Sequence, residues 1–449
     1  MYPHTLKGFK KLAAHSALVA ITVIGASHTA HATSLVEAVA EAVNNHPEVK
    51  SALSNKASIN YEATEAKAGY LPTIDLEVGS GWEQSNNATT RSRGSRPTTN
   101  GDSSRDMWRS ESSITLRQML YDGGRTYNQV RQQKARTRSA SSVLEETQEN
   151  IALRAVEAYL DVLRNEDLVD LAQENVDNHQ DYLNKIKARA QGGRGSQADV
   201  QQAEARLALA HASLTRAKGD RDNAVANYEE VVGLDVEGLK MPSIPASALA
   251  SDRKAAVSYA LERNPAIASA KADIEAANAS TQETKSNFLP RVDLELSAAR
   301  NENLDGSPNE NNEAMSMVRM RYNLYNGGAD QALKRQRLER LSQARHELDV
   351  ANRIIAENVS VAWNNMVTAK NRIKPLSEHV AAVSKTRNAY LQQFEINQRS
   401  LLDLLDTEVE VFNAKQALIN GRYAADFAVY EVLANTGVLV ETVQASNNL

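Results

Sequence analysis

Cysteine is absent from this 449-residue chain. The protein therefore forms no disulfide and carries no lipid-anchoring cysteine, so its stability must come from packing. Proline is scarce too, because none occurs between Pro97 and Pro242. That gap leaves room for very long helices, since a proline inside a helix costs about 3 kcal/mol or more. No segment after residue 32 has 18 consecutive apolar residues, so the sequence predicts no membrane-spanning helix in the mature chain.

The first 32 residues have the pattern of a secretory signal peptide. Three lysines lie between residues 7 and 11, residues 12–26 are mostly apolar, and small residues precede a cut after Ala32. We therefore expect an exported chain. The full chain has 51 basic and 56 acidic residues, and the signal peptide carries three lysines and no acid, so the mature chain has a net charge of about −8. This balance argues against a nucleic-acid partner, which requires a concentrated positive face.

The chain contains two copies of one pattern. Leu71-Pro72 recurs as Leu289-Pro290 at an offset of 218 residues, and the Tyr-Asp-Gly-Gly step at Tyr121 recurs as Tyr-Asn-Gly-Gly at Tyr325, at an offset of 204. The copies thus differ by 14 residues in the loop between these steps. Such self-similarity predicts one architecture used twice. We place the signal peptide at 1–32, the first repeat at 33–233, a linker at 234–252, the second repeat at 253–437 and a C-terminal tail at 438–449.

Apolar and polar residues alternate after each Leu-Pro step. The alternation predicts two β-hairpins, at about residues 72–121 and 290–325, with apolar side chains on one face. Each strand is about ten residues long, near the length that crosses a bilayer when tilted. Four strands cannot close a barrel and lipid tolerates no open sheet edge, so a membrane barrel would need several chains. The alternation alone also fits a soluble two-sided sheet with one hydrated face.

Two sets of side chains on these strands are candidates for functional roles. Aromatic residues bracket the hairpins, as the two belts of a membrane barrel would. The belt candidates are Trp82, Trp108, Tyr121 and Tyr325. Charged residues occupy alternate positions, where they would keep a pore hydrated. The candidates that face the lumen are Asp75, Glu77, Arg117, Asp293, Glu295 and Arg321.

The rest of each copy has helical patterns. Each copy is expected to contain a first helix, a long helix with a seven-residue period and a return helix. The predicted ranges are 35–69, 125–190 and 197–232 in the first copy, and 254–287, 329–394 and 401–435 in the second. Heptads this rich in alanine indicate closely packed coiled-coil pairs, and a helix of about 66 residues spans on the order of 100 Å. Pro375 lies inside the second long pattern, where we expect a kink or a local break.

Together these elements resemble the TolC family of outer-membrane exit ducts, over essentially the whole mature chain. The most specific segment runs from Phe394 to Asp406 and is followed by Phe412-Asn413-Ala414-Lys415-Gln416; it is similar to the inner hairpin at the closed end of such tunnels. The resemblance implies a membrane β-barrel joined to a long α-helical coiled-coil barrel. It implies four strands per chain, a 12-stranded barrel in a homotrimer, and a location in the outer membrane of a Gram-negative bacterium, extending into the periplasm.

The same resemblance implies a passive duct that contacts outer-membrane lipid and docks onto an adaptor protein. The adaptor would connect it to an inner-membrane ABC transporter or proton-driven pump. We expect type I protein secretion, because the overall pattern resembles that branch and no lipid-anchor cysteine is present. Multidrug or small-molecule efflux is the alternative cargo class. A periplasmic coiled-coil adaptor or scaffold without a pore is the alternative of a different class, and it would not need strands that face lipid.

The candidate gate lies at the tip of the inner hairpin. By match to the family, Asp403, Asp406 and Arg399 constrict the entrance. Asp199 from the first copy matches an ionic partner, and Phe394 stands where the family has a tyrosine. Asp403 and Asp406 are three residues apart and share a helix face. Three chains would therefore place six carboxylates around one axis, a ring that attracts cations.

These tip acids also have a structural interpretation. Ser196-x-x-Asp199 and Ser400-x-x-Asp403 both have the spacing of a capping box, in which a serine begins a helix and an acid three residues later returns a hydrogen bond. Such acids stabilise a helix start by roughly 0.3–1 kcal/mol in any protein. The capping role and the gating role can hold simultaneously.

Patterns typical of enzymes are missing from the sequence. No His, Cys or acidic set has the spacing of a metal site, no nucleophile is paired with a base, and no phosphate-binding loop occurs. We therefore expect no enzymatic activity, no cofactor and no metal.

Overall fold

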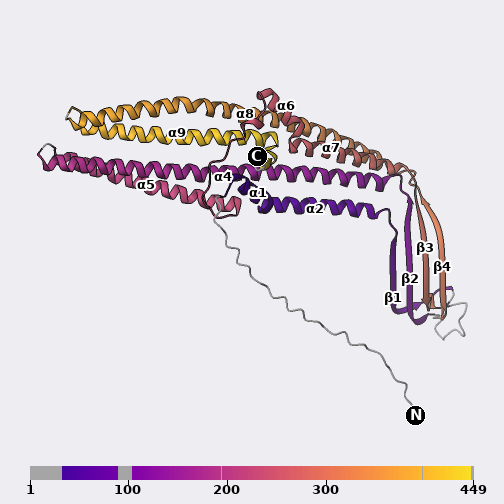
Figure 1. Ribbon diagram of the computed structural model, residues 1–449. Helices are drawn as coiled ribbons and strands as arrows, with labels where there is room; N and C mark the ends of the chain where they lie inside the picture. Colours follow the sequence, from indigo (N-terminus) through magenta and orange to yellow (C-terminus); the bar gives the residue numbers. More distant parts are fainter. Residues whose placement is uncertain (1–32, 89, 91–103, 194, 397, 446–449) are drawn as a thin grey trace, which may run out of the picture.

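The computed structural model describes residues 33–445 except 89, 91–103, 194 and 397. The expected signal peptide and residues 446–449 of the expected tail lie outside the described residues. The molecule is elongated: a β-sheet lies at one end, and two long helical hairpins extend to the other (Figure 1). Within the described residues, no helix is both long enough and apolar enough to cross a membrane.

The same order of elements occurs in both halves of the chain. The first half contains α1 (Leu35–Asn45), α2 (Pro47–Ala68), β1 (Thr73–Ser85), β2 (Arg105–Tyr121), α4 (Arg125–Gln191) and α5 (Gln197–Val232). The second half contains α6 (Arg253–Arg263), α7 (Pro265–Glu283), the 3-10 helix η2 (Thr284–Phe288), β3 (Arg291–Glu302), β4 (Glu310–Arg321), α8 (Ala329–Glu395) and α9 (Leu401–Thr436). The long helices and return helices begin where the sequence predicts and end within one residue of the predicted positions.

The prediction of a single helix at the start of each repeat is wrong, because two helices occupy that segment in each repeat. The breaks fall at His46 and Asn264, which have extended ψ values of 136° and 129°. A proline follows each of them, and the residue before a proline avoids the helical region. Pro47 and Pro265 then begin the next helix, where the missing N–H costs nothing. His46 Nδ1 accepts a hydrogen bond from the next helix at 3.2 Å, and Asn264 Oδ1 does so at 2.9 Å.

Pro375 does not interrupt α8, which continues through it from Ala329 to Glu395. The expected local break is therefore absent. The proline is exposed, so the carbonyl that loses its helical partner can be hydrated. Hydration lowers the penalty that normally makes proline a helix breaker.

The main hydrophobic core lies at mid-length, where α1, α4, α5 and α9 meet. Alanines on α4, among them Ala152, Ala155 and Ala158, are completely buried and allow the helices to approach closely. Tyr159 is also completely buried, and its hydroxyl donates to the Lys240 carbonyl at 2.7 Å. This bond holds the segment between the two halves against α4. Part of the expected C-terminal tail is ordered there as α10 (Leu439–Ala445), with Leu439 fully buried.

The four strands form one antiparallel sheet in the order β1-β2-β3-β4. Directly opposed residues share a face, and the register pairs Ile74 with Leu116, and Arg117 with Glu295. One face is therefore apolar and the other charged, as the alternation predicts. All six lumen candidates fall on the charged face. β4 ends at Arg321, before the expected end near residue 325.

Candidate functional site

At the tip of the first helical hairpin, Asp199 has a capping role. Ser196 Oγ accepts a hydrogen bond from Ala198 N at 3.0 Å, and Asp199 Oδ2 accepts one from Ser196 N at 3.2 Å. Together with the bond to the Asp199 backbone N–H, these contacts complete a capping box. The serine–acid spacing predicted this geometry from the sequence.

The second tip uses the same spacing differently. Ser400 Oγ accepts a hydrogen bond from Asp403 N at 3.2 Å, but the Asp403 carboxylate lies 3.6 Å from Arg399 Nη1. Arg399 also stacks on the Tyr390 ring, with its guanidinium carbon 3.9 Å from the ring centre, and donates to Gln393 Oε1 at 3.2 Å. Within one chain, Arg399 is therefore held by its own hairpin and not by Asp199. A pairing with Asp199 of another copy stays a prediction.

Asp406 connects the two halves of the chain. Arg206 Nη2 on α5 donates to Asp406 Oδ1 on α9 at 2.7 Å. The Asp406 side chain keeps 56% of its surface exposed, and that of Asp403 keeps 43%. Both candidate ring acids thus have a cationic neighbour and remain accessible to solvent, as a constriction would require.

Phe394 contacts a cation that the sequence analysis missed. The Arg189 guanidinium of α4 lies 4.4 Å from the centre of the Phe394 ring and donates to the Phe394 carbonyl at 2.9 Å. Lys185, one helical turn earlier, lies 3.6 Å from Glu395. These contacts attach the end of α8 to α4. A run of basic residues at the end of α4, within reach of the matched tip, was the signal available in the sequence.

A buried network centred on Glu408 lies further along the hairpins and was also missed. Glu408 is 2% exposed; it accepts hydrogen bonds from Asn178 at 2.8 Å and Tyr182 at 2.9 Å, and Arg387 lies 3.2 Å away. Burial, followed by the charge of Glu408, raises the pKa of Tyr182 to about 12. Burial lowers the pKa of His179, whose ring meets Tyr182 edge-on. The network fastens α4 to both α8 and α9.

On the charged face of the sheet, Glu295 is surrounded by arginines. Arg319 lies 2.9 Å from it, Arg117 lies 3.3 Å away and Arg321 lies 3.4 Å away. Asp293 is 1% exposed and pairs with Arg291 at 2.9 Å. The structure thus brings together four of the six lumen candidates as one charged cluster. The other two, Asp75 and Glu77, lie apart from it on the edge strand β1.

The aromatic candidates lie at opposite ends of the sheet. Trp82 and Trp108 are direct cross-strand partners and are 63% and 65% exposed. Tyr121 is the last residue of β2, at the end nearer the helices, and Tyr325 lies beyond the end of β4 with 84% of its surface exposed. The two ends of the sheet therefore carry exposed aromatic side chains, an arrangement typical of membrane belts.

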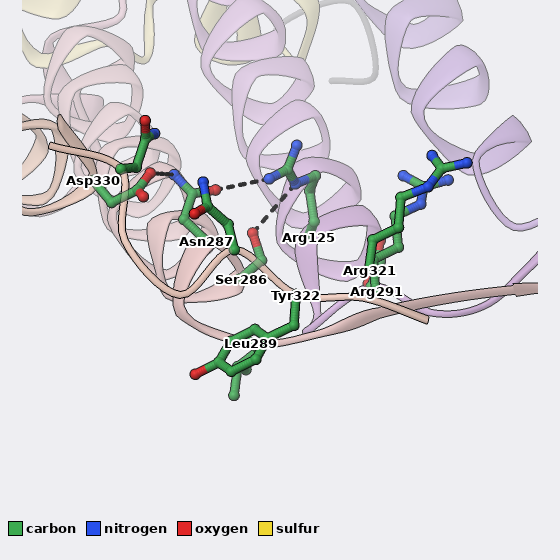
Figure 2. Close-up of a pocket in the computed structure, with 11 residues that line it drawn as sticks. Arg125, Ser286, Asn287, Leu289, Arg291, Arg321, Tyr322 and Asp330 are labelled. Carbon is green, nitrogen blue, oxygen red and sulfur yellow. Dashed lines mark hydrogen bonds between the residues drawn. The ribbon is translucent and has the colours of Figure 1, made fainter. Parts of the chain in front are cut away.

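A polar pocket of about 480 Å³ lies at the junction between the strands and helices (Figure 2). Arg125 of α4 donates to Ser286 at 3.2 Å and to Asn287 at 2.7 Å, and Asn287 donates to Asp330 of α8 at 2.8 Å. Asp122 accepts hydrogen bonds from Gly124 N and Thr126 N. Burial opposes ionisation of Asp122, but these hydrogen bonds outweigh it and lower its pKa. The junction is thus cross-linked between the halves.

Comparison with known proteins identifies the chain. It matches the family described as outer membrane efflux protein over residues 38–234 and 256–438. The chain belongs to this family. The outer membrane efflux protein BepC of Brucella suis is 28% identical over 432 residues, which cover 96% of this chain and 91% of BepC. The alkaline protease secretion protein AprF of Pseudomonas aeruginosa is 24% identical over 413 residues, which cover 88% of this chain and 82% of AprF.

Solved structures show the same fold. The CmeC outer membrane channel of Campylobacter jejuni superimposes with a TM-score of 0.74 at 15% identity, covering 90% of this chain and 86% of CmeC. The family-level resemblance inferred from the sequence is confirmed. The chain is an outer-membrane channel that extends into the periplasm, and it is a passive channel, not an enzyme. Among the described residues, no group of three or more His, Cys, Asp or Glu side chains could hold a metal ion.

Proposed function

We propose that three copies of this chain form one duct for type I protein secretion. The observation that carries the proposal is the sheet, which has two unpaired edges and an exposed apolar face. Ile74, Leu76 and Val78 are 63–74% exposed on that face. Lipid accepts such a face but accepts no open edge. Four strands cannot close alone, and three chains provide twelve, enough for an aqueous lumen.

The helices favour docking onto partners in the periplasm. At a 1.5 Å rise per residue, the 67 residues of α4 span on the order of 100 Å. The ends of both helical hairpins lie far from the sheet (Figure 1). A passive channel has no energy source of its own. We therefore propose that an adaptor protein joins the hairpin tips to an inner-membrane ABC transporter.

Similarity to AprF supports protein secretion, because AprF is named an alkaline protease secretion protein. Similarity to BepC supports efflux as the second candidate, because BepC is named an efflux protein. Under efflux, a proton-driven pump is the expected inner-membrane partner. The same duct geometry serves either cargo, so the transporter decides between them.

Detergent extraction followed by co-purification tests the proposal. The chain should stay with outer membranes until detergent is added, have the mass of a trimer, and conduct ions in planar bilayers. After crosslinking in cells, an ABC transporter should be recovered with the chain, whereas recovery of a proton-driven pump alone would favour efflux. A monomer that washes off without detergent and carries no current would refute the duct.

A further inference from the structure

At the end of the sheet nearer the helices, the two edge strands carry opposite charges. β1 and β4 lie at the two edges, with β2 and β3 between them. In a lipid environment each edge needs a strand from another molecule. If the trimeric duct proposed above is correct, the edge of one copy meets the other edge of the next. The edge residues then decide how the copies join.

Acidic side chains without an ion-pair partner lie on β1. Asp75 and Glu77 are exposed on the charged face, opposite Thr115 and Ser113 of β2. Neither acid has an ion-pair partner among the described residues. Two carboxylates two residues apart on one strand edge raise the local negative potential. A cationic strand is the neighbour that would relieve it.

The end of β4 nearer the helices carries two arginines and no acid. Arg319 and Arg321 lie on the charged face, opposite Asp293 and Arg291 of β3. Both share Glu295 with Arg117, so one carboxylate faces three guanidinium groups. The Arg319 and Arg321 side chains remain 42% and 61% exposed. Positive charge at this edge is therefore only partly neutralised within the chain.

The directions of the strands allow the two edges to pair. β1 leaves the helical end of the sheet at Thr73, and β4 returns to that end at Arg321. Copies arranged side by side around an axis therefore place β4 antiparallel to the next β1. Their apolar faces must point the same way, and a slip of one residue would invert every side chain. Only registers that differ by two residues remain.

We propose that β4 of one copy pairs with β1 of the next so that Arg321 lies opposite Asp75, and Arg319 opposite Glu77. This register is the one among those allowed that opposes both acids to both arginines at once. It also places Gly79 opposite Met317, Gly81 opposite Met315, and Glu83 opposite Glu313. Glu83 is paired with Arg109 of its own chain at 2.9 Å, which neutralises its charge. Added Cβ atoms at Gly79 and Gly81 would meet nothing within 4 Å in one chain, so there is room for the methionines. On the lipid face it aligns Leu76 with Met320, and Val78 with Val318.

Introduced cysteines test the register, because the natural chain has none. A disulfide needs Cα atoms within about 7 Å. Val78→Cys combined with Val318→Cys should give trimers linked by disulfides that a reducing agent cleaves. The crosslink must join different chains, because the two positions lie on opposite edges of one sheet. The matched controls pair Val78→Cys with Ser316→Cys or Met320→Cys, two residues to either side. These controls should crosslink weakly, and a control that crosslinks better than the Val318 pair would overturn the register.

Charge exchange tests the ion pairs. Arg319→Glu with Arg321→Glu should lose most of the trimer in mild detergent, because four acids would then meet at each seam. Adding Asp75→Arg and Glu77→Arg should restore it. An arginine role confined to its own chain predicts no rescue, so failed rescue would overturn the ion-pair assignment.

The outcomes also separate this proposal from the function. A natural chain that is monomeric in detergent and conducts no ions would refute the trimeric duct. A conducting trimer that crosslinks at another register would refute only the proposed seam.

Discussion

At the residue scale, the two acids at equivalent positions of the repeats differ sharply in their surroundings. Glu408 is buried among Asn178, Tyr182 and Arg387. Its counterpart Glu204 pairs with Lys187 at 2.8 Å, and both side chains are nearly half exposed. The duplication therefore supplies a natural control: the same residue type at the equivalent position of the corresponding helix, α5 or α9.

Glu408→Ala should loosen the second hairpin much more than Glu204→Ala. Removing Glu408 leaves Arg387, whose side chain is 17% exposed, without its carboxylate. Breaking a fully buried pair costs about 3–5 kcal/mol, which is an upper bound here. Removing Glu204 breaks an exposed pair worth ~0–1 kcal/mol. Amide hydrogen exchange over residues 401–412 measures the difference. Equal protection in the two variants would show that the Glu408 network does not fasten α9.

Arg399 makes three contacts within its own hairpin, so its proposed role in closing the entrance needs a separate test. Arg399→Ser should raise single-channel conductance, because the charge that could hold neighbouring copies together is removed. Arg399→Lys is the matched control, since it keeps the charge but loses the planar stacking on Tyr390. Conductance unchanged in the serine variant would argue against a latch. Increases of equal size in both variants would assign the effect to stacking on Tyr390.

At the scale of elements, α10 is held by one buried carboxylate of α4. Glu149 Oε2 accepts a hydrogen bond from Leu439 N at 2.9 Å, and Oε1 accepts one from Val440 N at 3.2 Å. Burial raises the pKa of Glu149 to about 7, although these N–H groups oppose the shift. The folded chain therefore binds more protons than the unfolded chain between the ordinary carboxyl pKa and about pH 7. Stability contributed by this site falls as the pH rises through that window.

This linkage predicts a loss of roughly 3 kcal/mol per chain between pH 4.5 and pH 7 from Glu149 alone. Glu149→Gln should remove most of that slope, because an amide does not titrate. Glu145→Gln, at an exposed position one turn away, should leave it unchanged. Denaturant midpoints measured at pH 5 and pH 8 decide the matter. If stability changes equally with pH in the natural chain and both variants, the assignment of the pH dependence to Glu149 is contradicted.

Local signals predicted the elements better than they predicted the contacts between them. The capping serines predicted the starts of α5 and α9, because the serine–acid spacing is a local signal. The helix breaks at His46 and Asn264 were missed although a proline follows each of them and the residue before a proline avoids the helical region. At Pro375 the expected local break is absent, because exposure lets water replace the lost hydrogen bond.

The candidate site was predictable only where one segment contains it. Asp199 caps its own helix as its spacing predicted, and the alternation placed the charged strand residues on one face. Arg189, Arg206 and Arg387 were missed because each meets a partner from a distant element. Such pairings depend on how the two coiled coils are aligned with each other. The heptad pattern within each half does not determine that alignment.

At the scale of the whole molecule, threefold assembly would bring Asp403 and Asp406 of three chains together as a ring. Asp403 and Asp406 are both accessible and both neighbour an arginine in the single chain. Three chains would place six carboxylates around one axis, beside three copies each of Arg399 and Arg206. The acids dominate the potential wherever those arginines point away from the axis. The negative potential of such a ring would raise the local concentration of cations at the entrance.

Asp403→Ala with Asp406→Ala should therefore abolish cation preference while the trimer persists. The reversal potential across a bilayer that separates unequal KCl concentrations measures it directly, and it should move toward zero. Glu410→Ala removes an exposed acid on the same helix and should leave the potential unchanged. If the double variant keeps the natural reversal potential, selectivity arises elsewhere. The charged strand face around Glu295 would then be the next region to vary, because it lines the other end of the same proposed passage.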